Sequence, residues 1–257
     1  MEVLMGVALI TGASSGIGME IAKILSKKGY GLILVARNKK ALDELAACLP
    51  NKTKTLGLDL SKEKDLNKLV SYVNKKRIDI LVNNAGFGDL GEFTKTSLDK
   101  ELNMIDLNIK AVHVLTKAVL KKMKKRNHGY ILNVASSAGL FYAGPYMATY
   151  YATKAYVTSL TTAIATELKN QNSKVCVSAL CPGPVDTNFN NVANVKFSLK
   201  GISPKFCAKV AIEEMFKGRV IIIPTYYMKL AVLGNRFLPR LLSAKICGNQ
   251  QSKKLNK

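Results

Sequence analysis

The sequence lacks the features that mark membrane-spanning and secreted chains. It contains no apolar run of about 18 residues, the length that spans a bilayer. At Met1 the chain leads directly into an apolar stretch, with neither a basic region nor a small-residue cleavage site. Its five cysteines include no CxxC pair and have no histidine-rich companion, so no disulfide framework and no metal site are expected. We therefore expect a cytoplasmic protein.

Acidic residues are scarce. The 17 Asp and Glu face 39 Lys and Arg, which gives a net charge of +22 and raises nucleic acid, anionic lipid or an acidic substrate as partners. The lysines are scattered, however, and the only dense run, residues 121–126, has no aromatic residues between its cations for stacking on bases. Cations complement the dipole at the end of a helix, so we expect a solvated helix end and no nucleic-acid partner.

The sequence also lacks repeats, low-complexity tracts and linkers rich in proline and glycine. Short apolar runs instead alternate with helical patterns, which is typical of βαβ units. Strands are expected at residues 7–10, 31–36, 53–58, 78–82, 130–134, 174–180 and 220–223. Helices are expected at residues 16–28, 39–48, 62–75, 99–125, 150–170 and 204–217. This pattern predicts an α/β fold, a single doubly wound Rossmann-type domain over residues 1–257 with a seven-stranded parallel sheet flanked by helices.

A glycine-rich turn follows the first expected strand and opens an amphipathic helix. Gly12 permits a tight turn, Gly16 lets the backbone approach a pyrophosphate, and Gly18 allows close helix packing. The start of the helix adds unpaired N–H groups and the positive end of the helix dipole. The turn therefore predicts a dinucleotide-phosphate site made by Gly12, Ser14, Ser15, Gly16, Ile17 and Gly18.

This turn has the spacing TGxxxGxG, and with motifs further along it resembles the short-chain dehydrogenase/reductase family. The further motifs are Asp59-Leu60, Asn83-Asn84-Ala85-Gly86, Asn108, Ser137, Tyr150 with Lys154, and Pro182-Gly183. They follow the family's order over nearly the whole chain. The resemblance implies hydride transfer between a nicotinamide cofactor and a small-molecule carbonyl or secondary alcohol. We also expect a homodimer or homotetramer.

The end of the second expected strand bears on which nicotinamide cofactor is used. No acidic residue is present there to accept hydrogen bonds from the adenosine ribose. Arg37 offers a planar fork to a 2′-phosphate, with Asn38 and either Lys39 or Lys40 as supports. Alternatively, these are solvated residues that open the next helix. Arginine here is a frequent NADP marker in the family that the sequence resembles, so we expect NADP(H) in preference to NAD(H).

Other cofactor contacts follow from the resemblance alone. It implies that one segment contacts the adenine, that the Asn-Asn-Ala-Gly turn closes over the adenosine half, and that a later loop binds the carboxamide side of nicotinamide. The residues concerned are Asp59, Leu60, Asn83, Ala85, Gly86, Pro182, Gly183, Val185 and Thr187.

Tyr150 and Lys154 are four residues apart, so they share one face of a helix. An ammonium beside a phenol stabilises the phenolate and lowers the phenol pKa toward working pH. The resemblance implies that Tyr150 is the general acid or base and that Lys154 also holds the nicotinamide ribose. It further implies that Ser137, thirteen residues before Tyr150, binds the substrate oxygen; Ser136 is the alternative. Asn108 would kink a helix and hold a water that links the lysine to solvent, or would simply face water.

The expected walls of a substrate pocket are Leu140, Phe141, Tyr142, Pro145 and Tyr146, with residues 187–203 as a mobile lid. They favour an apolar substrate that is steroid-, lipid- or acyl-like. Two other functions stay open. The first is a nucleotide sensor or nucleic-acid-binding protein without catalysis, which the presence of all three catalytic residues disfavours. The second is an epimerase or dehydratase, whose chains are generally longer.

Residues 226–257 are expected to form a C-terminal amphipathic extension. Its apolar side chains are Leu230, Leu233, Phe237, Leu238 and Leu241, and Lys229, Arg236 and Arg240 cluster beside them. Such a segment can lie on an anionic membrane surface, pack on its own subunit, or close a dimer. Pro239 interrupts a continuous helix in all three cases.

Overall fold

The computed structural model describes residues 5–187 and 201–255, with side chains through Ser252. Its centre is one parallel sheet in the order β3-β2-β1-β4-β5-β6-β7. The strands are β1 (Gly6–Thr11), β2 (Tyr30–Ala36), β3 (Thr53–Gly57), β4 (Ile80–Asn83), β5 (Gly129–Val134), β6 (Val175–Leu180) and β7 (Ile221–Ile222). The expected seven-stranded doubly wound sheet is confirmed.

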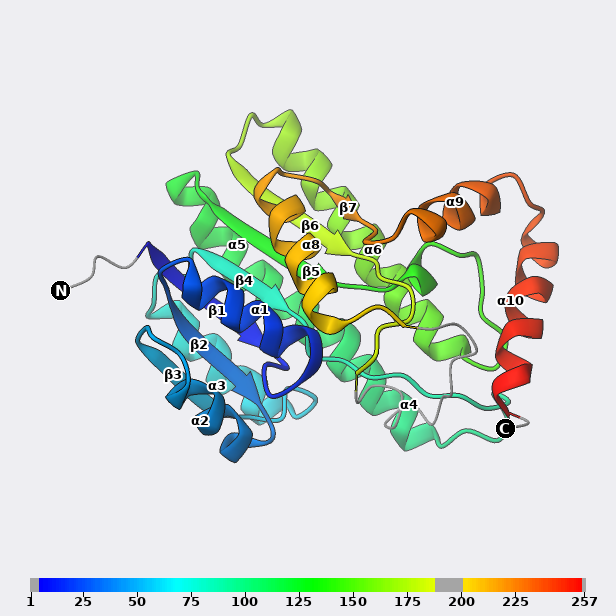
Figure 1. Ribbon diagram of the computed structural model, residues 1–257, viewed down its shortest axis with the longest axis horizontal. Helices are drawn as coiled ribbons and strands as arrows, with labels where there is room; N and C mark the ends of the chain where they lie inside the picture. The colour runs from blue at the N-terminus through cyan, green and yellow to red at the C-terminus, as the bar shows by residue number, and fades with distance from the viewer. Residues whose placement is uncertain (1–4, 188–200, 256–257) are drawn as a thin grey trace.

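Helices cover both faces of the sheet (Figure 1). Those before β5 are α1 (Gly16–Lys27), α2 (Lys39–Ala47), α3 (Glu63–Asn74), α4 (Leu98–Ile105) and α5 (Val112–Arg126). Those after it are α6 (Ala148–Asn170), α8 (Pro204–Phe216), α9 (Tyr226–Asn235) and α10 (Arg240–Leu255). One core lies between the sheet and α1, α2 and α8, and a second lies between the sheet and α3, α5 and α6.

The apolar runs form strands because a sheet covered on both faces buries every side chain along its central strands. In β4, Ile80 and Val82 enter the core beneath α1 and α8, whereas Leu81 enters the core beneath α3 and α5. Strand order reverses at β1, which pairs with β2 on one side and β4 on the other. A doubly wound sheet binds ligands at the carboxyl ends of its strands, beside such a reversal.

The helix expected over residues 99–125 is interrupted. A π-helical turn, Asp106–Ala111, separates α4 from α5. Asn108 lies within this turn and is fully buried, so the alternative that it simply faces water is wrong. A polar side chain buried in the middle of a helix needs partners outside that helix, and those partners belong to the site described below.

The dense basic run at the end of α5 partly fastens neighbouring elements. Lys122 Nζ donates to the carbonyls of Val73, Asn74 and Lys76 at 3.0, 2.9 and 2.7 Å, which caps the end of α3.

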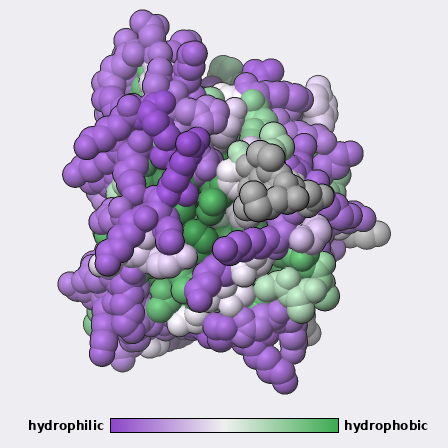
Figure 2. Space-filling view, turned by 90° about the vertical axis from the view of Figure 1, so that its left-hand side faces the viewer, coloured by the Kyte–Doolittle hydropathy of each residue, from purple (hydrophilic) through white to green (hydrophobic). Residues whose placement is uncertain are grey.

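Figure 2 shows that the face with the amino ends of the strands is mostly hydrophilic around a hydrophobic hollow. None of the helices in the described ranges is long and apolar enough to cross a membrane.

The C-terminal extension consists of two helices, α9 and α10, with the interruption before Arg240 that Pro239 predicts. Both lie beyond the carboxyl ends of the strands, at the right of Figure 1. The lid expected at residues 187–203 falls outside the described residues, apart from Thr187 and residues 201–203.

Candidate active site

A cavity of about 1440 Å³ opens at the carboxyl ends of the strands. One end is lined by the glycine turn and the ends of β2 and β3, and the other by α9 and α10. Most of the expected site residues line it: Gly12, Ser14, Ser15, Gly16, Ile17, Arg37, Asn38, Asp59, Leu60, Ala85, Gly86, Ser137, Tyr150, Lys154, Pro182, Gly183, Val185 and Thr187. Gly18, Asn83 and Asn108 do not line it.

The glycine turn has the geometry that its sequence predicts. Gly12 and Gly16 have φ of 65° and 56°, the left-handed region that side chains disfavour. A Cβ on Gly18 would lie 2.5 Å from the Gly12 carbonyl oxygen, so Gly18 serves close packing behind the turn. Ser15 makes no side-chain cap on α1, and the first turn of α1 has no acidic residue. The start of α1 therefore lies at the cavity with a composition that suits an anion.

The two asparagines at the end of β4 point to opposite sides. Asn84 lines the cavity, and its Nδ2 donates to the Thr11 and Gly12 carbonyls at 3.1 and 2.9 Å. Asn83 instead lies in the core, where its Nδ2 donates to Thr116 Oγ1 at 3.0 Å and Asn133 Oδ1 at 2.8 Å. The sequence motif includes Asn84 but suggested Asn83 as the cofactor contact, and the alternation of side chains along a strand could have identified Asn84.

At the adenosine end, Arg37 is exposed at the rim of the cavity. Asn38 caps α2 by accepting a hydrogen bond from Ala41 N at 3.1 Å. Lys39 Nζ lies 2.6 Å from Asp43 Oδ1 and is turned toward its own helix, which makes it a poor support for a phosphate. Asp59 Oδ1 accepts hydrogen bonds from the Ser61 hydroxyl at 2.7 Å and from the Ser61 backbone N at 3.1 Å.

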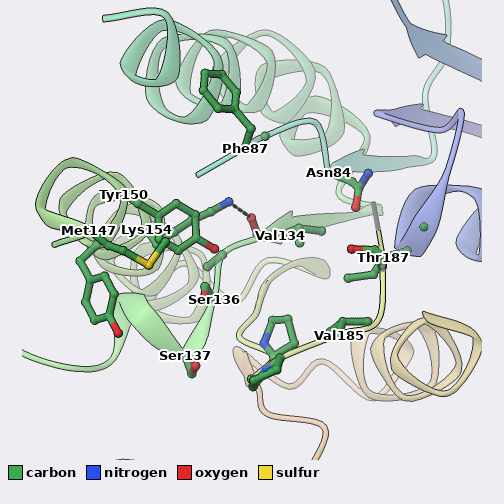
Figure 3. Close-up of a pocket in the computed structure, with 18 of the residues that line it drawn as sticks. Asn84, Phe87, Val134, Ser136, Ser137, Met147, Tyr150, Lys154, Val185 and Thr187 are labelled. Atoms are coloured by element: carbon green, nitrogen blue, oxygen red, sulfur yellow. Dashed lines mark hydrogen bonds between the residues drawn. The ribbon is translucent and has the colours of Figure 1, made fainter. Parts of the chain in front are cut away.

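Tyr150 and Lys154 are both buried beside the cavity, on the first turns of α6. Lys154 Nζ donates to the Val134 carbonyl at 2.9 Å and lies 5.8 Å from the centre of the Tyr150 ring (Figure 3). Burial raises the pKa of the Tyr150 phenol to about 12, although its hydrogen bond with Ser136 acts in the opposite direction. Burial also lowers the pKa of Lys154 to about 8. The phenol is therefore held protonated, and the lowered phenol pKa that the sequence predicts from Lys154 is not found in this structure.

The two candidate serines differ in their partners. The Ser136 hydroxyl hydrogen-bonds Tyr150 and accepts from Ala138 N at 3.1 Å. Ser137 is held through its backbone N, which donates to the Pro182 carbonyl at 2.8 Å. In Figure 3, Ser136 lies closer to Tyr150, while Ser137 projects away. Of the two, Ser136 is the serine that the structure places with the tyrosine.

Asn108 supports the site from behind. Its Oδ1 accepts from Phe87 N at 3.1 Å, and its Nδ2 donates to the Phe87 carbonyl at 2.9 Å and to Thr153 Oγ1 at 3.1 Å. A Cβ on Gly86 would lie 2.8 Å from Asn108 Oδ1 and 3.4 Å from Lys154 Nζ. Asn108 thus ties the strand-end turn of β4 to α6, and the lack of a side chain on Gly86 keeps the approach to Lys154 open.

The substrate end differs from the expected walls. Of those five residues only Phe141 lines the cavity, and the C-terminal helices supply much of the rest. Gln251 on α10 donates to the Tyr151 hydroxyl at 2.9 Å. Gly248 lets α10 approach Pro145, since a Cβ there would lie 3.1 Å from the proline ring. The inner side of the C-terminal extension therefore packs on its own subunit.

A family model described as short chain dehydrogenase matches residues 6–196. The chain belongs to the short-chain dehydrogenase family. It is 37% identical over 183 residues to an uncharacterized oxidoreductase of Staphylococcus epidermidis, a match that covers 70% of this chain and 78% of the relative.

Solved short-chain dehydrogenases share the fold. The enzyme from Sphingobium yanoikuyae, in complex with NADPH, is 30% identical with a TM-score of 0.82, and the match covers 90% of this chain and 94% of that one. A family member from Burkholderia phymatum, in complex with NAD, is 25% identical with a TM-score of 0.80, covering 91% and 93%. This short-chain dehydrogenase is accordingly an NAD(P)-dependent oxidoreductase.

The residues at the phosphate end fit such a dinucleotide. Two glycines hold left-handed backbone at the turn, and a Cβ on Gly16 would approach Thr187 to 3.1 Å across the entrance. The start of α1 has no side-chain cap, so its N–H groups could donate to phosphate oxygens. Within residues 5–187 and 201–252, no group of three or more His, Cys, Asp or Glu side chains could hold a metal ion.

Proposed function

We propose that this dehydrogenase transfers hydride between NADP(H) and an apolar substrate that carries a carbonyl or a secondary alcohol, with Tyr150 as general acid and base. One observation carries the proposal. Tyr150, Ser136 and Lys154 lie together beside a cavity that has the glycine turn at one end and apolar side chains of α9 and α10 at the other. A nicotinamide dinucleotide supplies or accepts the hydride when bound.

Tyr150 is suited to donate a proton to a substrate oxygen because burial keeps its phenol protonated. In the direction of alcohol oxidation it accepts the proton, and the positive charge of Lys154 and of oxidised nicotinamide favours the phenolate that this requires. The Lys154 ammonium is fixed by the Val134 carbonyl on one side and faces the opening left by Gly86 on the other. It would hold the nicotinamide ribose there.

Ser136 takes the role of positioning the substrate oxygen in this proposal, in place of Ser137. We expect Ser136→Ala to lower kcat/KM about 10²-fold, which is typical for loss of one hydrogen-bond donor to a reacting oxygen. Since the Ser136 hydroxyl lowers the pKa of Tyr150, the basic limb of the pH–rate profile should also move to higher pH. Ser137→Ala is the matched variant and should lower kcat/KM only a few-fold. A larger loss in Ser137→Ala would return the role to Ser137.

The preference for NADP(H) rests on Arg37, the exposed guanidinium at the adenosine rim of the cavity. A charge-assisted hydrogen bond contributes about 1.5–3 kcal/mol, so Arg37→Ala should raise KM for NADPH roughly 10- to 100-fold and leave KM for NADH unchanged. Lys39→Ala is the control, because Asp43 already holds the Lys39 ammonium. The assignment would be refuted by a wild type that uses NADH alone, or by an Arg37→Ala variant whose KM rises equally for NADPH and NADH.

The apolar character of the substrate is inferred from the inner wall of the cavity. Hydrophobic side chains from several segments of the chain line it: Phe87, Phe141, Met147, Met228, Leu238 and Ile246. Burying a hydrocarbon body against these side chains is favourable in free energy. NADPH consumption with ketosteroids, 3-oxoacyl thioesters, sugars and small aldehydes tests this directly. Turnover confined to sugars or small aldehydes would contradict the inference.

A further inference from the structure

The outer side of the C-terminal helices exposes a concentration of large hydrophobic side chains. Phe237 and Leu241, at the junction of α9 and α10, are 82% and 86% exposed. The outer apolar surface consists of these two residues together with Tyr226, Tyr227, Leu230, Leu233, Leu242 and Ile246. Large apolar surfaces exposed to solvent are uncommon on monomers and mark interaction sites.

On α9, most of this surface lies away from the side that packs on the enzyme. On α9 the inward side chains follow the spacing Met228, Val232 and Asn235, and all three are buried. The outward residues Leu230 and Leu233 fall between them and are each 51% exposed. The outer side of α9 is thus apolar, and packing on the subunit accounts only for its inner side.

The charge around the outer apolar surface has one sign. From Tyr226 to Lys257 the sequence contains seven Lys and Arg and no Asp or Glu. Lys229, Arg236, Arg240 and Lys245 are exposed among the hydrophobic side chains. A second copy placed symmetrically on this surface would bring these cations against their counterparts, which is unfavourable. An anionic lipid surface complements both the charge and the apolar side chains.

We propose that the outer apolar surface of α9 and α10 binds this enzyme to anionic lipid bilayers. Phe237 and Leu241 enter the boundary between headgroups and acyl chains, and the four cations contact lipid phosphates. Tyr227 and Ile246 belong to the outer apolar surface and also line the cavity, so a docked enzyme holds the substrate end of its cavity beside the bilayer. That last consequence rests on the proposed function, whereas membrane binding does not.

Vesicle sedimentation of the full-length chain tests the proposal. The wild type should sediment with vesicles of phosphatidylcholine that contain phosphatidylglycerol and remain largely in solution with phosphatidylcholine alone. Two double variants, Phe237→Ser/Leu241→Ser and Lys229→Glu/Arg236→Glu, should each lower the partition coefficient about tenfold or more. The first removes apolar area that the bilayer buries, and the second removes cations that attract anionic lipid. Lys117→Glu/Lys121→Glu changes the charge equally on exposed positions of α5 and should sediment like the wild type.

Three results would overturn the proposal. The first is equal sedimentation of the wild type with neutral and anionic vesicles. The second is sedimentation of the C-terminal variants that matches the wild type. The third is a wild type that does not sediment with vesicles but forms a dimer, together with a Phe237→Ser/Leu241→Ser variant that is monomeric. That result would assign the surface to a second copy of the chain. NADPH turnover in solution, measured on the same samples, separates failure of membrane binding from failure of the proposed reaction.

Discussion

Replacing Tyr150 with Phe is expected to lower kcat/KM for NADPH-linked reduction by roughly 10²- to 10⁴-fold, the range that general acid–base catalysis contributes. The substitution removes only the hydroxyl that hydrogen-bonds Ser136 and faces the cavity. The ring stays in a buried cluster with Met104, Ala138 and Met147. NADPH affinity should therefore change little, which fluorescence titration would measure alongside the steady-state rates.

Tyr156→Phe is the matched control for this substitution. Tyr156 lies on the same helix, is partly exposed, and hydrogen-bonds His113 Nδ1 at 2.7 Å outside the cavity. Removal of the Tyr156 hydroxyl should leave kcat/KM within a few-fold of the wild-type value. If Tyr150→Phe also retained full turnover, proton transfer by Tyr150 would be wrong, and the enzyme would need another donor.

The Lys154→Met variant should lose activity and gain stability near neutral pH. Burial lowers the pKa of Lys154 from 10.5 to about 8, and a shift of this size corresponds to about 3 kcal/mol against folding while the lysine is charged. Part of that gain is offset by loss of the hydrogen bond to the Val134 carbonyl, worth about 1 kcal/mol. We expect a net gain of about 2 kcal/mol at pH 7, measured by urea denaturation.

The pH dependence gives this prediction its sign. Between about pH 8 and pH 10.5 the unfolded chain keeps the Lys154 proton that the folded chain has released, so unfolding takes up a proton and stability rises with pH. Lys154→Met should lack this rise, while Lys169→Met, an exposed change on the same helix, should keep it. A Met variant that is less stable at pH 7, or has the wild-type pH slope, would contradict the account.

The fold was predictable because it depends on patterns that are local in sequence. Apolar runs alternate with helical spacing, and a glycine turn marks where the first strand ends, so the sheet and its ligand-binding edge follow. The interruption of the helix at Asn108 was expected from the family resemblance alone, because the π-helical turn is held by contacts with Phe87 and Thr153, which are distant in sequence.

The candidate site was predictable to within one residue at two places. Asn83 and Asn84 are neighbours at a strand end, so the pleat sends one into the core and the other into the cavity. Spacing to Tyr150 singled out Ser137, but Ser136 reaches the phenol because Ser137 is tied to Pro182 through its backbone. The contribution of α9 and α10 to the cavity lining was not predicted, because the apolar spacing of their exposed leucines dominates the sequence pattern and the inward side chains do not stand out from it.

The most direct test of NADP-linked hydride transfer follows the hydrogen itself. The enzyme would be incubated with an apolar ketone and NADPH that carries deuterium at its transferable position, and the alcohol product analysed by mass spectrometry and NMR. We predict one deuterium on the carbinol carbon for each NADPH consumed, and almost no product with Tyr150→Phe. Product without deuterium, or NADPH that binds and is never consumed with any carbonyl tested, would contradict the account.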